Sequence, residues 1–235
     1  GVLSYFRAWM LDIKHNLLHS EVKSPFTQLK PLFSTLALGY TTSLTWILWL
    51  LIGLAYPLFN SFIITYLNDG QSGGGSGFSN KTYRNYVIVS VCGVPGSLIG
   101  AWMVTWPRSG RRGAMAIGTL LSGVFLFGFT GVSSDPVSQL AFSSILNFME
   151  NIMYAVLNCY TPESFPAPLR ATAGGIASML NRAMGVVAAI FKVYTTGYTS
   201  FTTAQAPIYT SAALFVCSAL LMLALRVDNA ARTSI

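Results

Sequence analysis

The sequence predicts an all-α membrane protein with six transmembrane helices, and two observations support this. First, only 9% of the 235 residues are charged and 53% are hydrophobic, whereas a soluble domain carries about 25% charged residues. Second, the apolar runs are continuous and reach the ~20 residues that a membrane-spanning helix needs. This composition excludes an ordinary soluble enzyme and a disordered chain. The net charge of +7 does not gather on one basic face, so no nucleic-acid partner is expected.

The lipid bilayer is therefore the expected surrounding of most of the chain. The expected spans are residues 41–67, 86–106, 113–132, 140–160, 171–194 and 206–227, which together form a bundle over residues 31–227. Pro57 and Pro95 fall inside spans and are expected to kink their helices. Residues 228–235 follow the last span as a short tail.

The positive charges indicate which side of the membrane each loop faces. Of the 14 Lys and Arg residues, ten lie on the side that holds residues 1–40 and three on the other side. The positive-inside rule makes both termini and the tail cytoplasmic, and we expect the plasma membrane in preference to an internal one. The outer loop contains the sequon Asn80-Lys81-Thr82. Asn80 is a glycosylation candidate whose occupancy stays open, because it lies close to the membrane.

Residues 1–30 differ from the spans and are expected to be a cytoplasmic segment. Their apolar side chains follow helical spacing, which predicts an amphipathic helix on the inner membrane surface. A helix packed against a cytoplasmic partner is the alternative. The apolar positions are Val2, Phe6, Trp9, Met10, Ile13 and Leu17. His15 and His19 lie one turn apart, but no further ligand completes a set, so no metal and no cofactor are expected.

A polar stripe on the fourth span is the strongest sign of function, because polar groups inside a bilayer are costly. Its members recur at helical spacing and are Ser143, Asn147, Glu150, Asn151, Tyr154 and Asn158. Glu150 lies near the middle of its span, and Arg182, next to Asn181, lies near the middle of the fifth. Glu150 is either a proton-coupling or substrate-contacting group, or a structural carboxylate held by Arg182 or by Asn and Tyr neighbours.

The first span carries a weaker version of the same pattern. Trp49, Tyr56 and Asn60 follow helical spacing and are candidates for lining a pocket for a polar organic molecule. Packing is the equally weighted alternative for Trp49 and Tyr56. Gly96 and Gly100 form a G-x-x-x-G pair in the second span, which predicts close helix packing or a sliding surface.

Two inner loops carry charges that are candidates for a cytoplasmic gate. The first loop holds Arg108, Arg111 and Arg112, and the second begins near Glu163 and ends at Arg170. Glu163 is placed to pair with Arg170 or with the arginines of the first loop. Such pairs add little static stability, but a network that forms in one conformation can bias a two-state equilibrium.

Two sequence motifs resemble the major facilitator superfamily of transporters. Gly-Ala-Trp-Met-Val-Thr-Trp-Pro-Arg-Ser-Gly-Arg-Arg-Gly, residues 100–113, is similar to the loop between the eighth and ninth helices of that family. Tyr-Thr-Pro-Glu-Ser-Phe-Pro-Ala-Pro-Leu-Arg, residues 160–170, with the following residues to Arg182, resembles its tenth-to-eleventh helix region. This second match resembles the synaptic-vesicle-protein-like and sugar-porter-like branch with its fungal members. The resemblance covers about residues 35–230, the C-terminal six helices of a twelve-helix family.

The resemblance implies one half of an alternating-access carrier with a substrate site at the bilayer midplane. The implied partners are a small organic solute (a sugar or an organic, vitamin-like acid), H⁺, and an N-terminal six-helix half. Residues 1–30 would be the central cytoplasmic loop, and the gate charges named above would latch the inner side. Thr105 stands where the family often has an acidic residue, which departs from the usual latch in that loop.

A non-transporting receptor or scaffold built on the same bundle is the alternative function. An intramembrane Glu and Arg favour transport, because a scaffold does not need their cost. An enzyme is not expected, since no span contains a His and the three Cys have no recognisable partner. No filter-like loop points to a channel.

Overall fold

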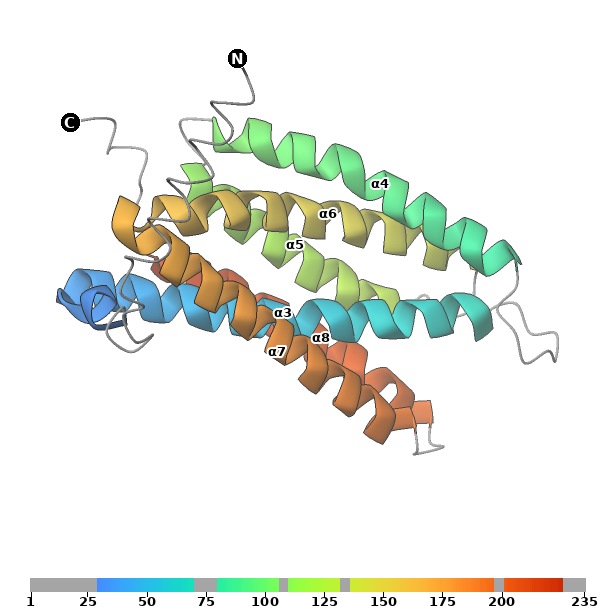
Figure 1. Ribbon diagram of the computed structural model, residues 1–235. Helices are drawn as coiled ribbons and strands as arrows, with labels where there is room; N and C mark the ends of the chain where they lie inside the picture. The colour runs from blue at the N-terminus through green and yellow to red at the C-terminus, as the bar shows by residue number, and fades with distance from the viewer. Residues whose placement is uncertain (1–28, 70–79, 106–109, 132–135, 197–200, 226–235) are drawn as a thin grey trace, which may run out of the picture.

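The structure, a computed structural model, describes residues 29–69, 80–105, 110–131, 136–196 and 201–225. Within these ranges the chain forms helices and no strand. The long helices are α3 (Leu36–Asp69), α4 (Asn80–Val104), α5 (Gly110–Gly131), α6 (Pro136–Glu163), α7 (Arg170–Thr196) and α8 (Phe201–Ala224). All six are long and apolar enough to cross a membrane, which confirms the expected all-α class (Figure 1).

Short 3-10 helices precede two of the long ones. They are η1 (Lys30–Phe33), ahead of α3, and η2 (Ala167–Leu169), ahead of α7. The side chain of Phe165 is buried with Leu32 and Ala173 in a small apolar cluster at this end of the bundle. This cluster fixes the loop between α6 and α7 against the start of α3.

The helices extend beyond the expected apolar spans at most of their ends. α3 begins at Leu36 instead of residue 41, and α6 covers Pro136–Glu163 instead of 140–160. Hydropathy marks the hydrocarbon-spanning part of a helix, whereas the backbone hydrogen bonds continue into the interfacial region. The helices continue through Pro57 and Pro95.

Several sequence-based expectations lie outside the described residues. They are the amphipathic helix, which falls almost wholly in residues 1–28, the tail at 228–235, and Arg108. Asn80 is the first residue of α4, but its side chain is not among those described. These expectations stay predictions.

The helices pack most closely in three pairs, α4 with α6, α3 with α7 and α5 with α8. α5 also packs against α6, and α8 also packs against α3, so α5 and α8 connect the other pairs (Figure 1). One apolar core joins them, with Ile52, Leu126, Met153 and Phe215 buried at its centre. In contrast, α6 and α7 contact each other little. This arrangement leaves space between α3, α6 and α7.

Glycines allow the close approach of α4 to α6. A Cβ atom on Gly96 would collide with the backbone carbonyl of Phe148, and one on Gly100 would lie 3.1 Å from the carbonyl oxygen of Ile152. Small side chains at such positions let helix backbones meet inside a membrane. The G-x-x-x-G pair therefore serves packing in this structure.

α7 has the opposite character, since it is the least buried of the six candidate spans among the described residues. Met179 is 65% exposed and Val186 is 62% exposed. Cβ atoms added to Gly174 or Gly175 would meet no atom within 4 Å. One long face of α7 is thus unpartnered within the part of the chain that the structure describes.

Candidate functional site

A groove of about 370 Å³ opens between α3, α6 and α7 at the place where α6 and α7 separate. Its lining combines aromatic, amide, hydroxyl and guanidinium groups. The lining residues are Trp49, Tyr154, Asn158, Thr161, Pro162, Gly174, Ser178, Asn181 and Arg182. Four of the substrate or coupling candidates from the sequence, Trp49, Tyr154, Asn181 and Arg182, meet here together with the stripe member Asn158. A volume of this size lies within the range of small-molecule sites.

Packing between α3 and its neighbours holds Trp49 and Asn181 in position. The indole Nε1 of Trp49 donates a hydrogen bond of 3.0 Å to Thr161 Oγ1 on α6. Asn181 lies directly against Gly53, where an added Cβ would be 2.5 Å from Asn181 Oδ1 and 2.8 Å from its Cα. Only a residue without a side chain at position 53 permits this contact between α3 and α7.

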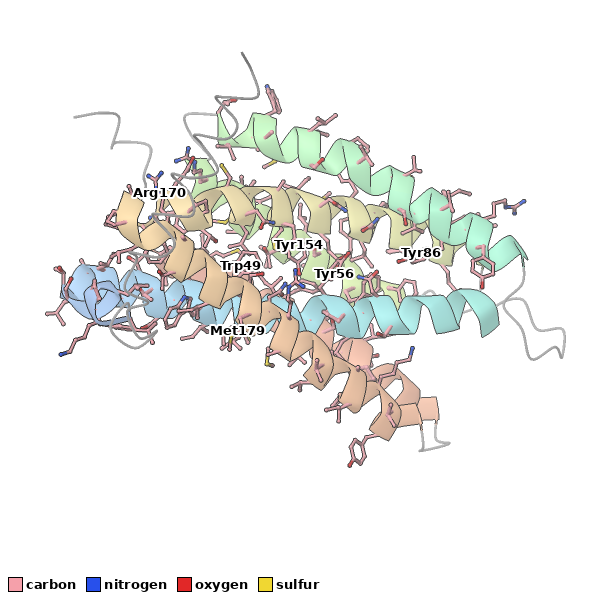
Figure 2. All side chains as sticks on the ribbon, in the orientation of Figure 1. Trp49, Tyr56, Tyr86, Tyr154, Arg170 and Met179 are labelled. Atoms are coloured by element: carbon pink, nitrogen blue, oxygen red, sulfur yellow. The ribbon has the colours of Figure 1, made fainter. Side chains whose placement is uncertain are left out.

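Two tyrosines join α3 to α6 beside the groove. The rings of Tyr56 and Tyr154 meet edge to face, with centroids 5.0 Å apart and planes at 78°. Figure 2 shows both in the centre of the bundle, with Trp49 nearer the start of α3. The Asn60 amide donates to the Tyr56 carbonyl at 3.2 Å and the Asn158 amide to the Tyr154 carbonyl at 2.9 Å. Asn60 itself does not line the groove.

Glu150 is buried in the middle of α6 and lacks a hydrogen-bond partner among the described residues. Its exposed fraction is 1%, and neither Oε1 nor Oε2 has a partner. Both Tyr56 and Tyr154 lie within electrostatic range of its carboxyl group. Charging an unpaired carboxylate at such a place costs free energy. A charged Glu150 would therefore need a partner that the described residues do not supply.

Arg182 does not form an ion pair with Glu150 in the described part of the chain. It is exposed, although it lies twelve residues past the start of α7 and fourteen before its end. It lines the groove and also a second, more open hollow of about 510 Å³ with Gly175, Met179 and Val186. The permanent Glu150–Arg182 pair considered from the sequence is absent among the described residues, where Glu150 is buried and Arg182 is exposed.

Asn147 and Asn151 belong to the contact between α4 and α6 and do not line the groove. The Asn147 amide donates to the carbonyl of Val89 at 2.7 Å, and the Asn151 amide donates to the Asn147 carbonyl at 2.8 Å. A Cβ on Gly93 would lie 2.5 Å from Asn151 Nδ2. The polar stripe thus has two parts, one that packs against α4 and one that faces the groove.

Three polar groove residues, Asn158, Thr161 and Ser178, were not among the substrate or coupling candidates from the sequence. Asn158 was visible as a stripe member, and Thr161 lies at helical spacing from Tyr154 and Asn158 on the same face. Ser178 lies one turn from Gly174 on α7, and its sequence position does not mark it as a pocket residue. Its position in the groove depends on how α7 crosses α3.

At the loop end of the bundle, charged side chains tie α5 to its neighbours. Arg111 reaches Glu163 through Nη1 to Oε2 at 2.7 Å and Nη2 to Oε1 at 3.1 Å. Arg112 donates to the carbonyl of Leu223. Arg170 donates to the carbonyl of Phe165 at 3.0 Å, so of the two pairings open from the sequence, Glu163 adopts the one with the first loop.

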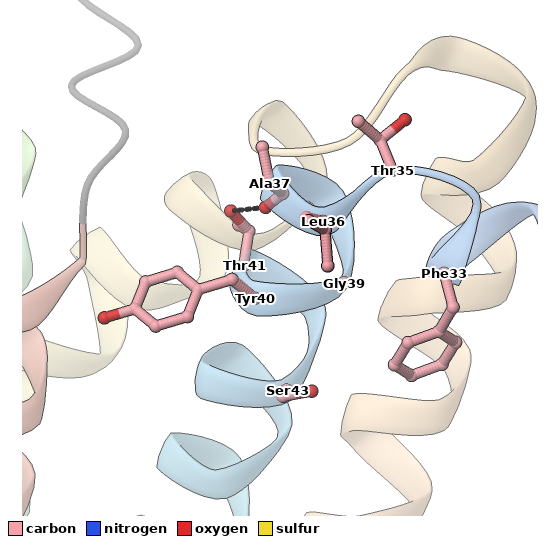
Figure 3. Close-up of a pocket in the computed structure, with 8 residues that line it drawn as sticks. All are labelled: Phe33, Thr35, Leu36, Ala37, Gly39, Tyr40, Thr41 and Ser43. Atoms are coloured by element: carbon pink, nitrogen blue, oxygen red, sulfur yellow. Dashed lines mark hydrogen bonds between the residues drawn. The ribbon is translucent and has the colours of Figure 1, made fainter.

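A larger cavity of about 670 Å³ lies at the start of α3 (Figure 3). It is lined by Phe33, Thr35, Leu36, Ala37, Gly39, Tyr40, Thr41 and Ser43. Thr41 Oγ1 donates to the carbonyl of Ala37 at 3.0 Å, so this hydroxyl is bonded within its own helix. The described residues that line the cavity include no charged side chain, and the cavity lies far from the middle of α3. The groove at Arg182 is therefore the better candidate site.

Comparison with known proteins gives consistent relatives, although no family model matches the sequence. The chain is 44% identical over 190 residues to the major facilitator-type transporter hxnZ of Emericella nidulans, covering 79% of this chain and 32% of that protein. It is 39% identical over 207 residues to the MFS siderochrome iron transporter 1 of Ceriporiopsis subvermispora, covering 88% and 38%. It is 32% identical over 118 residues to the niacin transporter NiaP of Acinetobacter baylyi, covering 48% and 26%. The chain thus spans about a third of the length of its curated relatives.

Proposed function

Since the chain belongs to the major facilitator superfamily, we propose that it transports a small organic solute by alternating access and uses a proton gradient. In this proposal it forms the C-terminal six-helix half of a longer secondary carrier. The observation that carries the proposal is Glu150, a mid-helix carboxyl group that is 1% exposed and lacks a hydrogen-bond partner within the described residues. Intramembrane ionisable groups of this kind mark proton and substrate pathways.

The position of Glu150 fits a coupling role because its carboxyl group is buried next to the groove without lining it. Tyr56 and Tyr154 stand within electrostatic range of its carboxyl group, and Tyr154 also lines the groove. A movement of α6 against α3 would change the surroundings of the carboxyl group and of the groove together. A proton and a solute bound at these two places would then be exposed to one side or the other by the same motion.

The open face of α7 supports the role of half a carrier. Met179 and Val186 are exposed on it, and Gly174 and Gly175 leave room for another backbone to approach. The chain spans about a third of its relatives, so most of a carrier of their length lies elsewhere. We place the missing N-terminal six helices against this face. In the same proposal the protein lies in the plasma membrane with cytoplasmic termini.

The inner charges would serve as the gate of this carrier. The Arg111–Glu163 pair and the bond from Arg112 to Leu223 hold the loop ends of α5, α6 and α8 together. Arg108 and Arg170 are further members of the proposed gate. Breaking these contacts would cost little free energy, but it would shift the equilibrium between the two conformations of the carrier.

The names of the relatives support an organic solute but differ among themselves. One is named a siderochrome iron transporter and another a niacin transporter. A sugar or an organic, vitamin-like acid remains the proposed substrate class.

The test is uptake by the complete protein in proteoliposomes under an imposed pH gradient, over a panel of sugars and small carboxylic acids. Glu150→Gln keeps the size of the side chain and removes its titration, and we expect it to lose gradient-driven accumulation while keeping counterflow exchange. Asp69→Asn, which removes a carboxylate at the end of α3, is the matched control and should accumulate substrate normally. Accumulation by Glu150→Gln at the wild-type level would assign coupling elsewhere. A folded wild type that moves no solute would favour the receptor or scaffold function.

A further inference from the structure

The guanidinium of Arg182 is a positive charge that the described part of the chain does not neutralise. No ion pair or hydrogen bond of its side chain occurs there, and Glu150 is buried away from it. With ~1.5 Å of rise per residue, Arg182 lies roughly 18–21 Å from either end of α7. Lipid phosphates are beyond its reach at that depth. A charge held so deep is costly unless an anion or a water-filled site receives it.

The surroundings of Arg182 specify what kind of anion fits. Trp49 and Tyr154 supply aromatic surface, while Asn158 and Asn181 supply neutral amide groups, and none of the described residues that line the groove is acidic. Aromatic surfaces favour a planar apolar body. The guanidinium has a planar fork of donors that matches a carboxylate in two parallel hydrogen bonds.

We propose that the groove between α3, α6 and α7 binds a monocarboxylate with a small planar ring, anchored through its carboxylate by Arg182. This inference rests on the proposed transport function and narrows its substrate class to acids. The ring lies between Trp49 and Tyr154, and the amides of Asn158 and Asn181 meet polar atoms at its edge. Gly174, two turns from Arg182 on α7, leaves that part of the groove open, since a Cβ there would meet no atom of the described residues within 4 Å.

The experiment compares acids with their neutral twins, because an amide keeps the shape of the acid and removes its charge. Equilibrium binding of nicotinate and nicotinamide, and of benzoate and benzamide, is measured by isothermal titration on the complete protein in nanodiscs. The variants are Arg182→Gln and Arg182→Lys. Arg84→Gln is the matched control, since Arg84 is an exposed arginine near the outer end of α4. Thermal unfolding of each variant reports its folding.

We expect wild type to bind each acid at least about 30-fold more tightly than its amide, the usual scale for losing one partner of a charge pair that the complete carrier buries. Arg182→Gln should abolish this preference, Arg182→Lys should keep part of it, and Arg84→Gln should match wild type. If Arg182→Gln fails to fold, the wild-type acid-to-amide ratio and Arg182→Lys still decide the matter.

Three results would overturn the inference. The first is equal binding of acid and amide by wild type. The second is a preference for the acid that persists in Arg182→Gln. The third is transport of neutral sugars by a protein that binds no acid. The second result, together with a lower unfolding temperature, would mean that Arg182 pairs with an acid in the rest of the complete protein. Each leaves the transport function intact if solute uptake persists, whereas a folded protein that moves no solute at all overturns transport as well.

Discussion

The guanidinium of Arg111 and the carboxylate of Glu163 face each other across the loop ends of α5 and α6, with two nitrogen–oxygen contacts of 2.7 and 3.1 Å. The residues are 52 positions apart in sequence, so the pair fixes tertiary structure and not a single helix. Their side chains are 25% and 35% exposed, so water screens the pair only in part. The thiol of Cys159 lies 3.6 Å from the same carboxylate.

This pair should contribute modestly to stability and more to the conformational equilibrium. We expect Arg111→Gln and Glu163→Gln to be non-additive in a double-mutant cycle of thermal unfolding, with a coupling free energy of about 1 kcal/mol. The exchanged variant Arg111→Glu/Glu163→Arg should recover part of the transport rate that either single reversal loses. Additive single variants, or an exchanged variant as inactive as its parents, would show that the contact has no role in the gate.

Gly53 should be intolerant of any side chain because Asn181 fills the space beside it. Gly53→Ala places a Cβ 2.5 Å from Asn181 Oδ1 and 2.8 Å from backbone atoms of Asn181, and α3 and α7 must move apart. Such overpacking costs about 1–3 kcal/mol, measured as a lower free energy of unfolding, and should weaken substrate binding by displacing Asn181.

Gly185→Ala is the matched control on the same pair of helices. Its new Cβ would lie 3.9 Å from Pro57 Cγ, an ordinary contact, and alanine favours a helix. Its stability should equal or exceed that of wild type. Equal losses from the two variants would mean that general glycine flexibility, and not the Gly53–Asn181 contact, sets the cost.

The two parts of the polar stripe should respond differently to truncation. Asn147→Ala removes the 2.7 Å hydrogen bond to the Val89 carbonyl between α6 and α4. It should lower the free energy of unfolding by about 0.5–2 kcal/mol and leave the KM of uptake unchanged. Asn158→Ala removes an exposed groove amide whose hydrogen bond to the Tyr154 carbonyl stays within α6. That variant should raise KM with little effect on stability, and the reverse pattern would exchange the two assignments.

The six helices could be predicted from sequence because continuous apolar runs are a strong one-dimensional signal. The mid-helix positions of Glu150 and Arg182 could be predicted from the bounds of the same apolar runs. The division of the stripe into two parts could not be predicted. Helical spacing puts Asn147, Glu150 and Asn158 on the same side of α6, and it does not say which neighbouring helix each of them meets. Only the crossing of α4 over α6 covers Asn147 and leaves Asn158 open.

The ion-pair partners of Glu150 and Glu163 also could not be predicted from the sequence. Glu150 and Arg182 have the same depth in adjacent spans, and depth alone suggested a pair. The structure separates them because α6 and α7 have little contact and α7 packs chiefly on α3. Likewise the sequence does not distinguish Arg111 from Arg170 as the partner of Glu163. In the structure the Arg170 side chain bonds to the Phe165 carbonyl instead.

Tyr154 connects the groove to Glu150, and its ring and hydroxyl can be tested separately. Tyr154→Phe keeps the edge-to-face contact with Tyr56 at 5.0 Å, which is worth about 0.5–1.5 kcal/mol, and removes only the hydroxyl. We expect it to unfold at the wild-type temperature and to bind substrate normally. Tyr154→Leu removes the ring and should be less stable and bind more weakly.

Gradient-driven uptake distinguishes the role of the hydroxyl. If the phenol helps to stabilise or relay the proton on Glu150, Tyr154→Phe should reduce accumulation under a pH gradient by more than it reduces counterflow exchange. The Tyr194→Phe variant is the control for the loss of a hydroxyl elsewhere, since Tyr194 is 72% exposed near the end of α7 and does not line the groove. Equal accumulation by Tyr154→Phe and wild type would show that Tyr154 acts through its ring alone, because the only group removed is the hydroxyl within electrostatic range of Glu150.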